Sequence, residues 1–190
     1  MGDQQRLLDI YLGDHLAGAT AGVDLARRMA HQHPLGAAIC PIAAEIDADR
    51  RTLIEVMASV GAEPSPLKVA LGWIAEKGGR MKLNDRLFGR SPLSGVLELE
   101  GLIVGVSGKL QLWRALGDVA QHDSRLAGFD FADLGARAKD QRQRLEELHE
   151  ESVSAALEPG CPGTCLQSPT TGRDKAKRSE KRDERVRQDV

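Results

Sequence analysis

The sequence predicts an all-α protein built as a four-helix bundle, and three observations support this fold class. Of the 190 residues, 41% are hydrophobic but only 3% are aromatic, so a core must be built from Leu, Val, Ile and Ala. An aliphatic composition favours helices, whereas strands are enriched in β-branched and aromatic residues. Long segments repeat apolar residues at helical spacing, and no strong run alternates in the manner of a strand.

The first half of the chain contains two such segments. One runs over about residues 4–31 and the next over about residues 36–60, where Gly61 offers a helix stop. A turn centred near Pro34 separates them, so the two helices are expected to pack as an antiparallel hairpin. Their apolar stripes consist of Leu8, Leu12, Leu16, Ala19, Val23, Ala26 and Ala30, and of Ile39, Ile42, Ile46, Leu53, Met57 and Val60.

The second half repeats this arrangement. A helix is expected to open at Ser91, a natural N-cap, with Pro92 at the first helical position, and to extend to about residue 120. Another helix opens near Asp130 and runs to about Leu157, after a turn centred near Leu126. Residues 62–90, between the halves, also keep helical spacing and predict a shorter helix. The predicted fold is therefore two antiparallel hairpins joined by a helical crossover.

The last part of the chain has a different composition. Residues 158–190 contain almost no large apolar side chains, and from Arg173 onward they hold eight Lys or Arg and five Asp or Glu. Such a segment cannot bury enough surface to offset the entropy of ordering, so it is expected to be a disordered tail after a bundle over residues 1–157. Weak nucleic-acid association through this mixed-charge tail is the alternative to a merely solvated segment.

Two observations bear on location. No apolar run reaches the roughly 18 residues that span a bilayer, and the first residues, "MGDQQRLLD", are polar, unlike a signal peptide. A cytoplasmic protein without a membrane segment is therefore expected. Of the three cysteines, Cys161 and Cys165 lie in "CPGTC" without the further ligands of a zinc site, so ordinary thiols are expected. Cys40 is expected to be buried or half-buried.

Four stretches of the chain are similar to a bacterial branch of the ferritin-like superfamily. They are "YLGDHLAGATAG", "AAEIDADR", "KGGRMKLN" and "SPLSGVLELEGLIVGVSGK", and the resemblance covers roughly residues 5–157. It implies a bundle whose two hairpins are joined by a long crossover. It also implies iron or manganese as the cofactor to test for, because many ferritin-like bundles hold a carboxylate-bridged di-metal centre.

Such a centre takes a Glu from each of two helices and a Glu-x-x-His from each of the other two. The first helix has no inward Glu but places His15 inward, with Asp14 turned toward solvent. On the second helix Glu45 is followed three positions later by Ala48 rather than His, although Asp49 falls on the apolar stripe.

The other two helices match the pattern better. Glu100 flanks the stripe of the third helix, and "EELH" supplies Glu146-x-x-His149 on the fourth. Helix rise and the two turn positions predict His15 near Asp49 and Glu100 near His149. A contact of His15 with Asp49 would form a buried polar pair that fixes helix register.

Only one of two Glu-x-x-His motifs is present, so the sequence favours a degenerate bundle without a cofactor. The expected function is a non-enzymatic structural or protein-interaction role, with a homodimer or another protein as partner. The alternative is an iron or manganese oxidoreductase or metal-binding protein that uses all six candidates. These are His15, Glu45, Asp49, Glu100, Glu146 and His149.

Small residues recur on two of the helices. Glycines stand at positions 18 and 22 of the first helix, and at positions 101, 105 and 108 of the third. Each costs about 1 kcal/mol relative to Ala in a helix, so a packing role is expected. The prediction is that these glycines let helices approach closely, within the chain or across a dimer.

Overall fold

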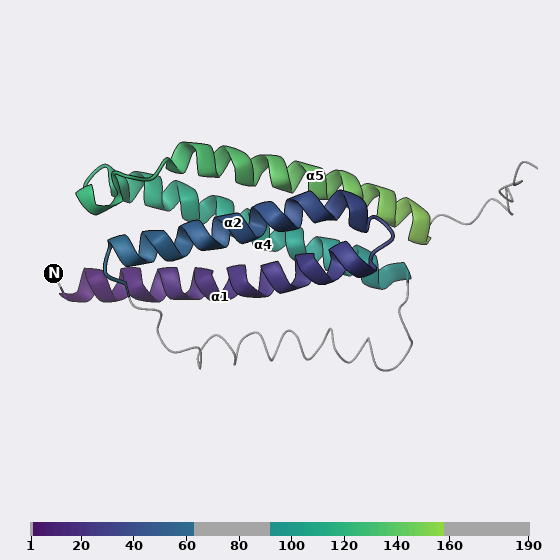
Figure 1. Cartoon of the computed structure of the whole chain (residues 1–190), viewed down its shortest axis with the longest axis horizontal. Coiled ribbons are helices and arrows are strands. Elements are labelled where there is room, and N and C mark those ends of the chain that lie inside the picture. Colours follow the sequence, from purple (N-terminus) through teal and green to yellow (C-terminus); the bar gives the residue numbers. More distant parts are fainter. Residues whose placement is uncertain (1, 63–91, 158–190) are drawn as a thin grey trace, which may run out of the picture. The chain divides into compact units, whose positions relative to one another are not determined.

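The structure is a computed structural model that describes residues 2–62 and 92–157. Within these ranges the chain forms four long helices and one short 3-10 helix, and it contains no strand, which confirms the all-α class (Figure 1). The elements are α1 (Gly2–Gln32), α2 (Gly36–Ser59), α4 (Pro92–Ala120), η1 (Ser124–Leu126) and α5 (Phe131–Leu157). The predicted crossover helix and the predicted disordered tail lie outside the described residues.

Two helix hairpins make up the fold. Helices α1 and α2 pack against each other through a tight turn, and α4 and α5 pack against each other through η1. Both turns lie where the sequence predicts them. In the first turn, the backbone N–H of Gly36 donates to the carbonyl of His33 at 2.9 Å. A Cβ at Gly36 would lie 2.4 Å from the carbonyl oxygen of Ala30, so only glycine fits this position.

Contacts between the hairpins define their relative direction. At one end Gly95 of α4 lies against the ring of His33, beside the first turn. At the other end the guanidinium of Arg125, in η1, donates to the carbonyl oxygen of Val60 at 2.8 Å. Helices α2 and α4 therefore run in the same direction, and the end of α2 and the start of α4 lie at opposite ends of the bundle (Figure 1).

Local sequence signals set two of the helix ends. Gly61 adopts a left-handed φ of 68°, as predicted for a helix stop. Around it, the N–H of Ala62 donates to Met57 at 2.9 Å and that of Gly61 donates to Ala58 at 3.2 Å, which is a Schellman motif. At the start of α5, the carboxylate of Asp130 accepts from the N–H of Asp133 at 2.9 Å and caps the helix.

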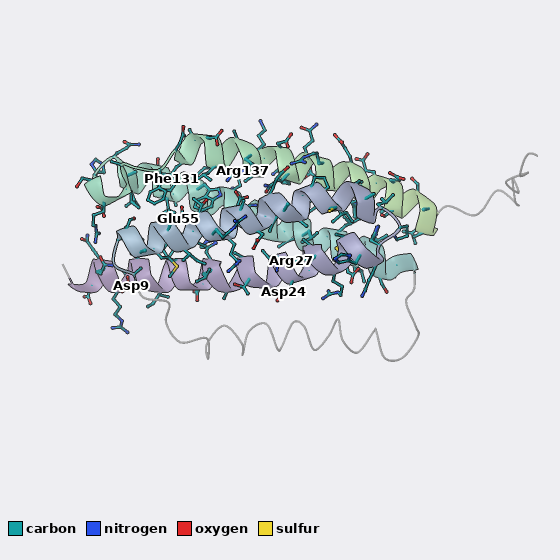
Figure 2. All side chains as sticks on the ribbon, viewed as in Figure 1. Asp9, Asp24, Arg27, Glu55, Phe131 and Arg137 are labelled. Atoms are coloured by element: carbon teal, nitrogen blue, oxygen red, sulfur yellow. The ribbon has the colours of Figure 1, made fainter. Side chains whose placement is uncertain are left out.

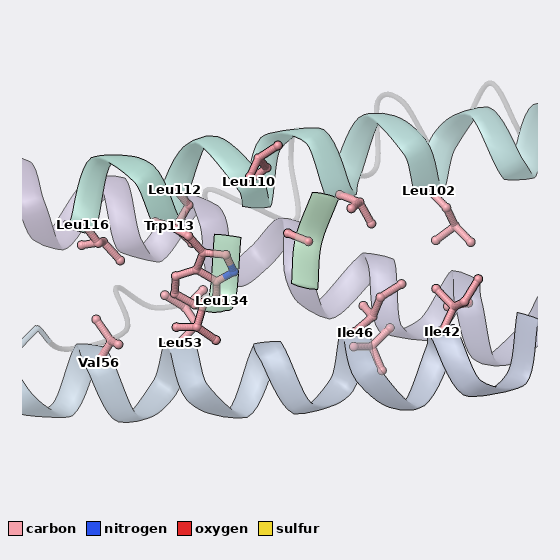
Figure 3. Close-up of a cluster of buried hydrophobic side chains, with 14 of the residues drawn as sticks. Ile42, Ile46, Leu53, Val56, Leu102, Leu110, Leu112, Trp113, Leu116 and Leu134 are labelled. Atoms are coloured by element: carbon pink, nitrogen blue, oxygen red, sulfur yellow. The ribbon is translucent and has the colours of Figure 1, made fainter. Parts of the chain in front are cut away.

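The core is aliphatic, as the composition requires. Trp113 is the largest fully buried side chain among the described residues and lies near Leu53 of α2, Leu112 of α4 and Leu134 of α5 (Figure 3). Burying one such side chain contributes roughly 1.5–3 kcal/mol. Charged side chains such as Asp24, Arg27 and Glu55 lie on the outside (Figure 2). The most buried leucines and isoleucines are Leu12, Ile39, Ile42, Leu53, Leu99, Leu112, Leu116, Leu126 and Leu145.

Cys40 departs from its prediction, because the structure places it in an exposed position on α2. The buried face of this part of α2 contains Ile39, Ile42 and Ala43. Successive residues turn by about 100°, so Cys40 and Pro41 project from the other side of the helix. Among the helices described here, none is both long enough and apolar enough to cross a membrane.

Candidate functional site

Among residues 2–62 and 92–157, one carboxylate is buried, and it lies among polar side chains inside the bundle. Asp49 is 1% exposed and stands on the core face of α2, between Ile46 and Leu53, as its place on the apolar stripe predicts. The ammonium of Lys109, on α4, donates to its Oδ2 at 2.5 Å. The guanidinium of Arg137, on α5, donates to its Oδ1 from Nε at 2.8 Å and from a terminal nitrogen at 2.5 Å.

Gln141 completes the arrangement. Its side chain is fully buried, and its Nε2 donates to Oδ2 of Asp49 at 3.1 Å while its Oε1 accepts from Lys109 at 2.5 Å. We call Asp49, Lys109, Arg137 and Gln141 the Asp49 cluster. Both carboxylate oxygens have charged donors, so the desolvation of Asp49 is offset by charge-assisted hydrogen bonds. Burial lowers the pKa of Lys109, and the neighbouring carboxylate of Asp49 opposes that change.

Helical spacing explains why these side chains meet. Arg137 and Gln141 are one turn apart on α5, so both face the same direction. Gln141 also falls on the buried stripe of α5, with Leu134, Ala138 and Leu145. A polar residue on an apolar stripe is the signal that identifies Asp49 and could have identified Gln141. Lys109 and Arg137 carry no such signal, because a cation at the edge of a stripe is ordinary in a surface helix.

The remaining predicted ligands lie in separate pairs outside this cluster. Glu100 and His149 face each other, with 3.2 Å between Oε1 and Nε2, which confirms the predicted proximity. Glu45 forms an ion pair with Arg144 of α5. Glu146, at the exposed surface, is 3.3 Å from the guanidinium of Arg142.

His15 occupies a different environment from the predicted one. It is half-buried, and its ring meets that of Tyr11 edge to face with 4.6 Å between centroids. Burial lowers its pKa, and the charge of Asp14 acts in the opposite direction. The hydrogen bonds of Asp49 go to Lys109, Arg137 and Gln141 rather than to His15, although both residues border one cavity.

The six candidate residues do not fit a carboxylate-bridged di-metal centre as the structure places them. Bridging requires inward carboxylates that share metal ions, whereas Asp49, Glu45 and Glu146 each engage a cationic side chain. Across residues 2–62 and 92–157, no group of three or more His, Cys, Asp or Glu is positioned to hold a metal ion. The geometry gives a buried ion-pair network and, apart from it, the pair of Glu100 and His149.

A cavity of about 490 Å³ adjoins the Asp49 cluster and opens to the surface, lined by residues of α1, α2 and α4. Gly18, Gly105 and Gly108 border it, and a Cβ built on any of these would meet no atom of the described residues within 4 Å. The same holds for Gly22, while Gly101 has one contact, with Leu25 at 3.5 Å. Within the described residues, Gly101 is therefore the one of these glycines with a neighbouring helix in contact, and close approach across a dimer stays a prediction. Three of them leave open space instead.

Comparison of the chain with protein-family models, with curated proteins and with solved structures finds no match. The comparisons identify no family, and the ferritin-like resemblance stays a prediction drawn from the sequence. Function is therefore argued from the Asp49 cluster, the cavity and the exposed surface.

Proposed function

We propose that this chain is a non-enzymatic bundle of ferritin-like type that serves as a structural or protein-interaction protein. One observation carries the proposal. The bundle interior, where a ferritin-like enzyme holds its metal ligands, is filled here by the Asp49 cluster. Lys109 and Arg137 supply to the buried carboxylate the positive charge that a metal ion supplies in such an enzyme.

The order of the helices supports the ferritin-like part of the proposal. Two hairpins lie side by side, and a long connection joins the end of α2 to the start of α4 at the opposite end of the bundle. This arrangement with one long crossover is that of ferritin-like folds, and it differs from the short loops of simple up-down-up-down bundles. The arrangement of the helices supports only the fold type and gives no information about activity.

The chemistry of the Asp49 cluster favours a structural role. A general base must reach the proton of a substrate, yet Asp49 is 1% exposed and both of its oxygens already accept hydrogen bonds. Its partners come from two further helices. The network thus fixes the register of α2 against α4 and α5, because sliding any of these helices by a turn would leave charges unpaired in the core.

The exposed surface supports an interaction role. Leu7, Ile10 and Tyr11 of α1 have exposed fractions of 66%, 47% and 37%, and helical spacing groups them on neighbouring faces. Apolar side chains grouped on a surface favour contact with a second copy or another protein. A cytoplasmic location remains the prediction of the sequence.

Metal analysis tests the proposal against its alternative, an iron or manganese oxidoreductase. The full chain is purified without chelator from cultures supplied with iron, manganese or zinc, and bound metal is measured by mass spectrometry. We expect far less than one metal ion per chain in each case. Stoichiometric iron or manganese that is lost in an E100Q/H149Q variant would overturn the proposal.

Sedimentation analysis addresses the partner. The full chain is compared with a Leu7→Glu/Ile10→Glu variant, which places charges on the apolar surface of α1. A concentration-dependent dimer that the variant lacks identifies a second copy as the partner. If the chain is a monomer at every concentration, the partner is a different protein. Binding of that protein should then be lost in the Leu7→Glu/Ile10→Glu variant.

A further inference from the structure

The cavity beside the Asp49 cluster has the size of a ligand site. Its volume of about 490 Å³ falls within the roughly 300–1,000 Å³ of pockets that hold small organic molecules. It is open because Gly18, Gly105 and Gly108 border it without side chains. Alanine would fit at each position without a close contact and would favour the helix, so the glycines keep space open at a cost in stability.

Two hydrogen-bond donors border this space without a full set of acceptors. Trp113 is 1% exposed, and its indole N–H has no partner among the described residues. The ammonium of Lys109 has three N–H donors, of which Asp49 and Gln141 accept two. Lys109 and Trp113 are one turn apart on α4, so they share one face of that helix. Buried donors without acceptors are costly, and an acceptor group in the cavity would satisfy the third donor of Lys109, whereas the indole nitrogen of Trp113 is itself covered by protein atoms.

The charge around the cavity favours an anionic acceptor. The single negative charge of Asp49 is shared between Lys109 and Arg137, which leaves the Asp49 cluster with one excess positive charge. The carboxylate of Glu45 also acts on Lys109, but it is paired with Arg144, so the excess remains. Burial lowers the pKa of His15, which favours its neutral form. The exposed Asp14 is a carboxylate that also borders the cavity, and it lies next to His15 on α1.

The rest of the lining is apolar except for Arg50, whose guanidinium pairs with Asp47. Leu53 of α2, together with Val104 and Leu112 of α4, borders the space away from the charged groups. In the close-up, the indole ring of Trp113 lies near Leu53 and Leu112, with its nitrogen on the side toward Ile46 (Figure 3). The lining therefore combines one positively charged, donor-rich region with aliphatic walls, as in sites for amphiphilic molecules.

We propose that this cavity binds a small apolar carboxylic acid. Its carboxylate accepts a hydrogen bond from Lys109, and its hydrocarbon part packs against the aliphatic walls and the ring of Trp113. The site goes beyond the proposed structural role, because a bundle that only holds its shape would gain from a filled cavity. Ligand binding and the Asp49 cluster share Lys109, so occupancy would also stabilise the fold.

Titration of the full chain with decanoate tests the proposal. A Trp73→Phe background leaves Trp113 as the one indole, since the chain has two tryptophans. Fluorescence and calorimetry are recorded below the micelle-forming concentration, with 1-decanol and decyltrimethylammonium as probes of equal chain length. We expect saturable binding of one decanoate per chain, weaker binding of the alcohol by about tenfold, and the weakest binding of the cation. Absence of saturable decanoate binding overturns the proposal.

Two glycine variants test where the ligand binds. Gly108→Leu fills the cavity, whereas Gly22→Leu places the same side chain on a half-buried helical glycine that does not border it. We expect Gly108→Leu to weaken decanoate binding at least tenfold and Gly22→Leu to leave it unchanged. Circular dichroism checks folding, and Gly105→Leu replaces Gly108→Leu if that chain does not fold. Equal affinity of the cavity variant and the control overturns the assignment.

A lysine variant tests the carboxylate preference. Lys109→Met keeps an unbranched apolar side chain but removes the ammonium, while Asp49 retains Arg137 and Gln141 as partners. We expect the preference for decanoate over 1-decanol to disappear, because decanoate loses a charged donor that the alcohol uses weakly. A preference that persists in Lys109→Met would place the carboxylate elsewhere and overturn the proposal. Metal analysis is independent of these titrations, so the two proposals fail separately.

Discussion

Asp49 of α2 and Lys109 of α4 are 60 positions apart in the sequence, yet only 2.5 Å separates the carboxylate Oδ2 from the ammonium nitrogen inside the bundle. Arg137 and Gln141 bring α5 to the same carboxylate. One acidic side chain thus connects both hairpins. The stability of the whole bundle should depend on it more than on any surface ion pair.

Replacement of Asp49 tests that dependence. Asp49→Ala leaves the largely buried Lys109 and the half-buried Arg137 without their counter-charge. Removal of one partner from a buried pair costs about 3–5 kcal/mol, and solvent access to Arg137 places the expected loss at the lower end of that range. Urea denaturation should show this loss in the free energy of unfolding. Asp47→Ala is the matched control, because Asp47 pairs with arginines near the surface. Its replacement should lower the free energy of unfolding by about 1 kcal/mol or less. Similar losses in both variants would contradict a special role for Asp49.

Gln141 should also contribute measurably. Gln141→Leu removes a donor to Asp49 and an acceptor for Lys109 in a fully buried position, so we expect a loss of about 1–3 kcal/mol. The exposed Gln143 donates only to Glu147 one turn away, and Gln143→Leu should change stability by less than about 0.5 kcal/mol. Thermal unfolding of the two variants provides the comparison, and an equal effect would show that burial of Gln141 is unimportant.

The ring of His33 leaves no space for a side chain at position 95. A Cβ at Gly95 would lie 2.6 Å from Nε2 of the buried His33 ring, so Gly95→Ala should destabilise the chain although alanine favours helices. A double-mutant cycle with His33→Ala measures the coupling, and the alanine at position 95 should be tolerated once the ring is absent. At Gly22, where nothing lies within 4 Å of a Cβ, alanine should stabilise by about 0.5–1 kcal/mol. Additive effects at positions 95 and 33 would argue against the contact.

His15 should make stability depend on pH. Burial holds its pKa in the folded chain below the ordinary value of 6.5, so the unfolded chain binds more protons between the two values. The associated stability is present above pH 6.5 and is lost as pH falls through 6.5 toward the folded pKa. Denaturation from about pH 7.5 to pH 5.5 should show a shallower decline in His15→Gln than in the parent chain. Parallel curves would show that His15 is equally solvated in both states.

The sequence was sufficient to predict the four described long helices and the two turns that join them in pairs. Apolar spacing and helix-end residues such as Gly61 act locally, so they can be read without knowing which helices are neighbours. The same logic placed Asp49 in the core and Glu100 beside His149. The predicted contact between His15 and Asp49 was wrong. The partner of Asp49 depends on how three helices pack together, and the spacing within one helix does not determine that packing.

The glycines show a second limit of sequence reasoning. A glycine in a helix is compatible with close packing and with an empty space, and only the neighbouring helix distinguishes the two. Gly101 meets Leu25, whereas Gly105, one turn later, borders the cavity. Likewise, nothing in the sequence distinguished Lys109 from a lysine on a surface helix, although it takes part in both the Asp49 cluster and the cavity lining.

The charges of the Asp49 cluster are divided between the two halves of the chain. The α1–α2 hairpin contributes the acid, and the α4–α5 hairpin contributes both bases and the amide. Two copies of the first hairpin would bury acid against acid, and two copies of the second would bury base against base, which is unfavourable in either case. The charges of each hairpin therefore complement those of the other hairpin, so the core discriminates against pairing of two like hairpins from different molecules.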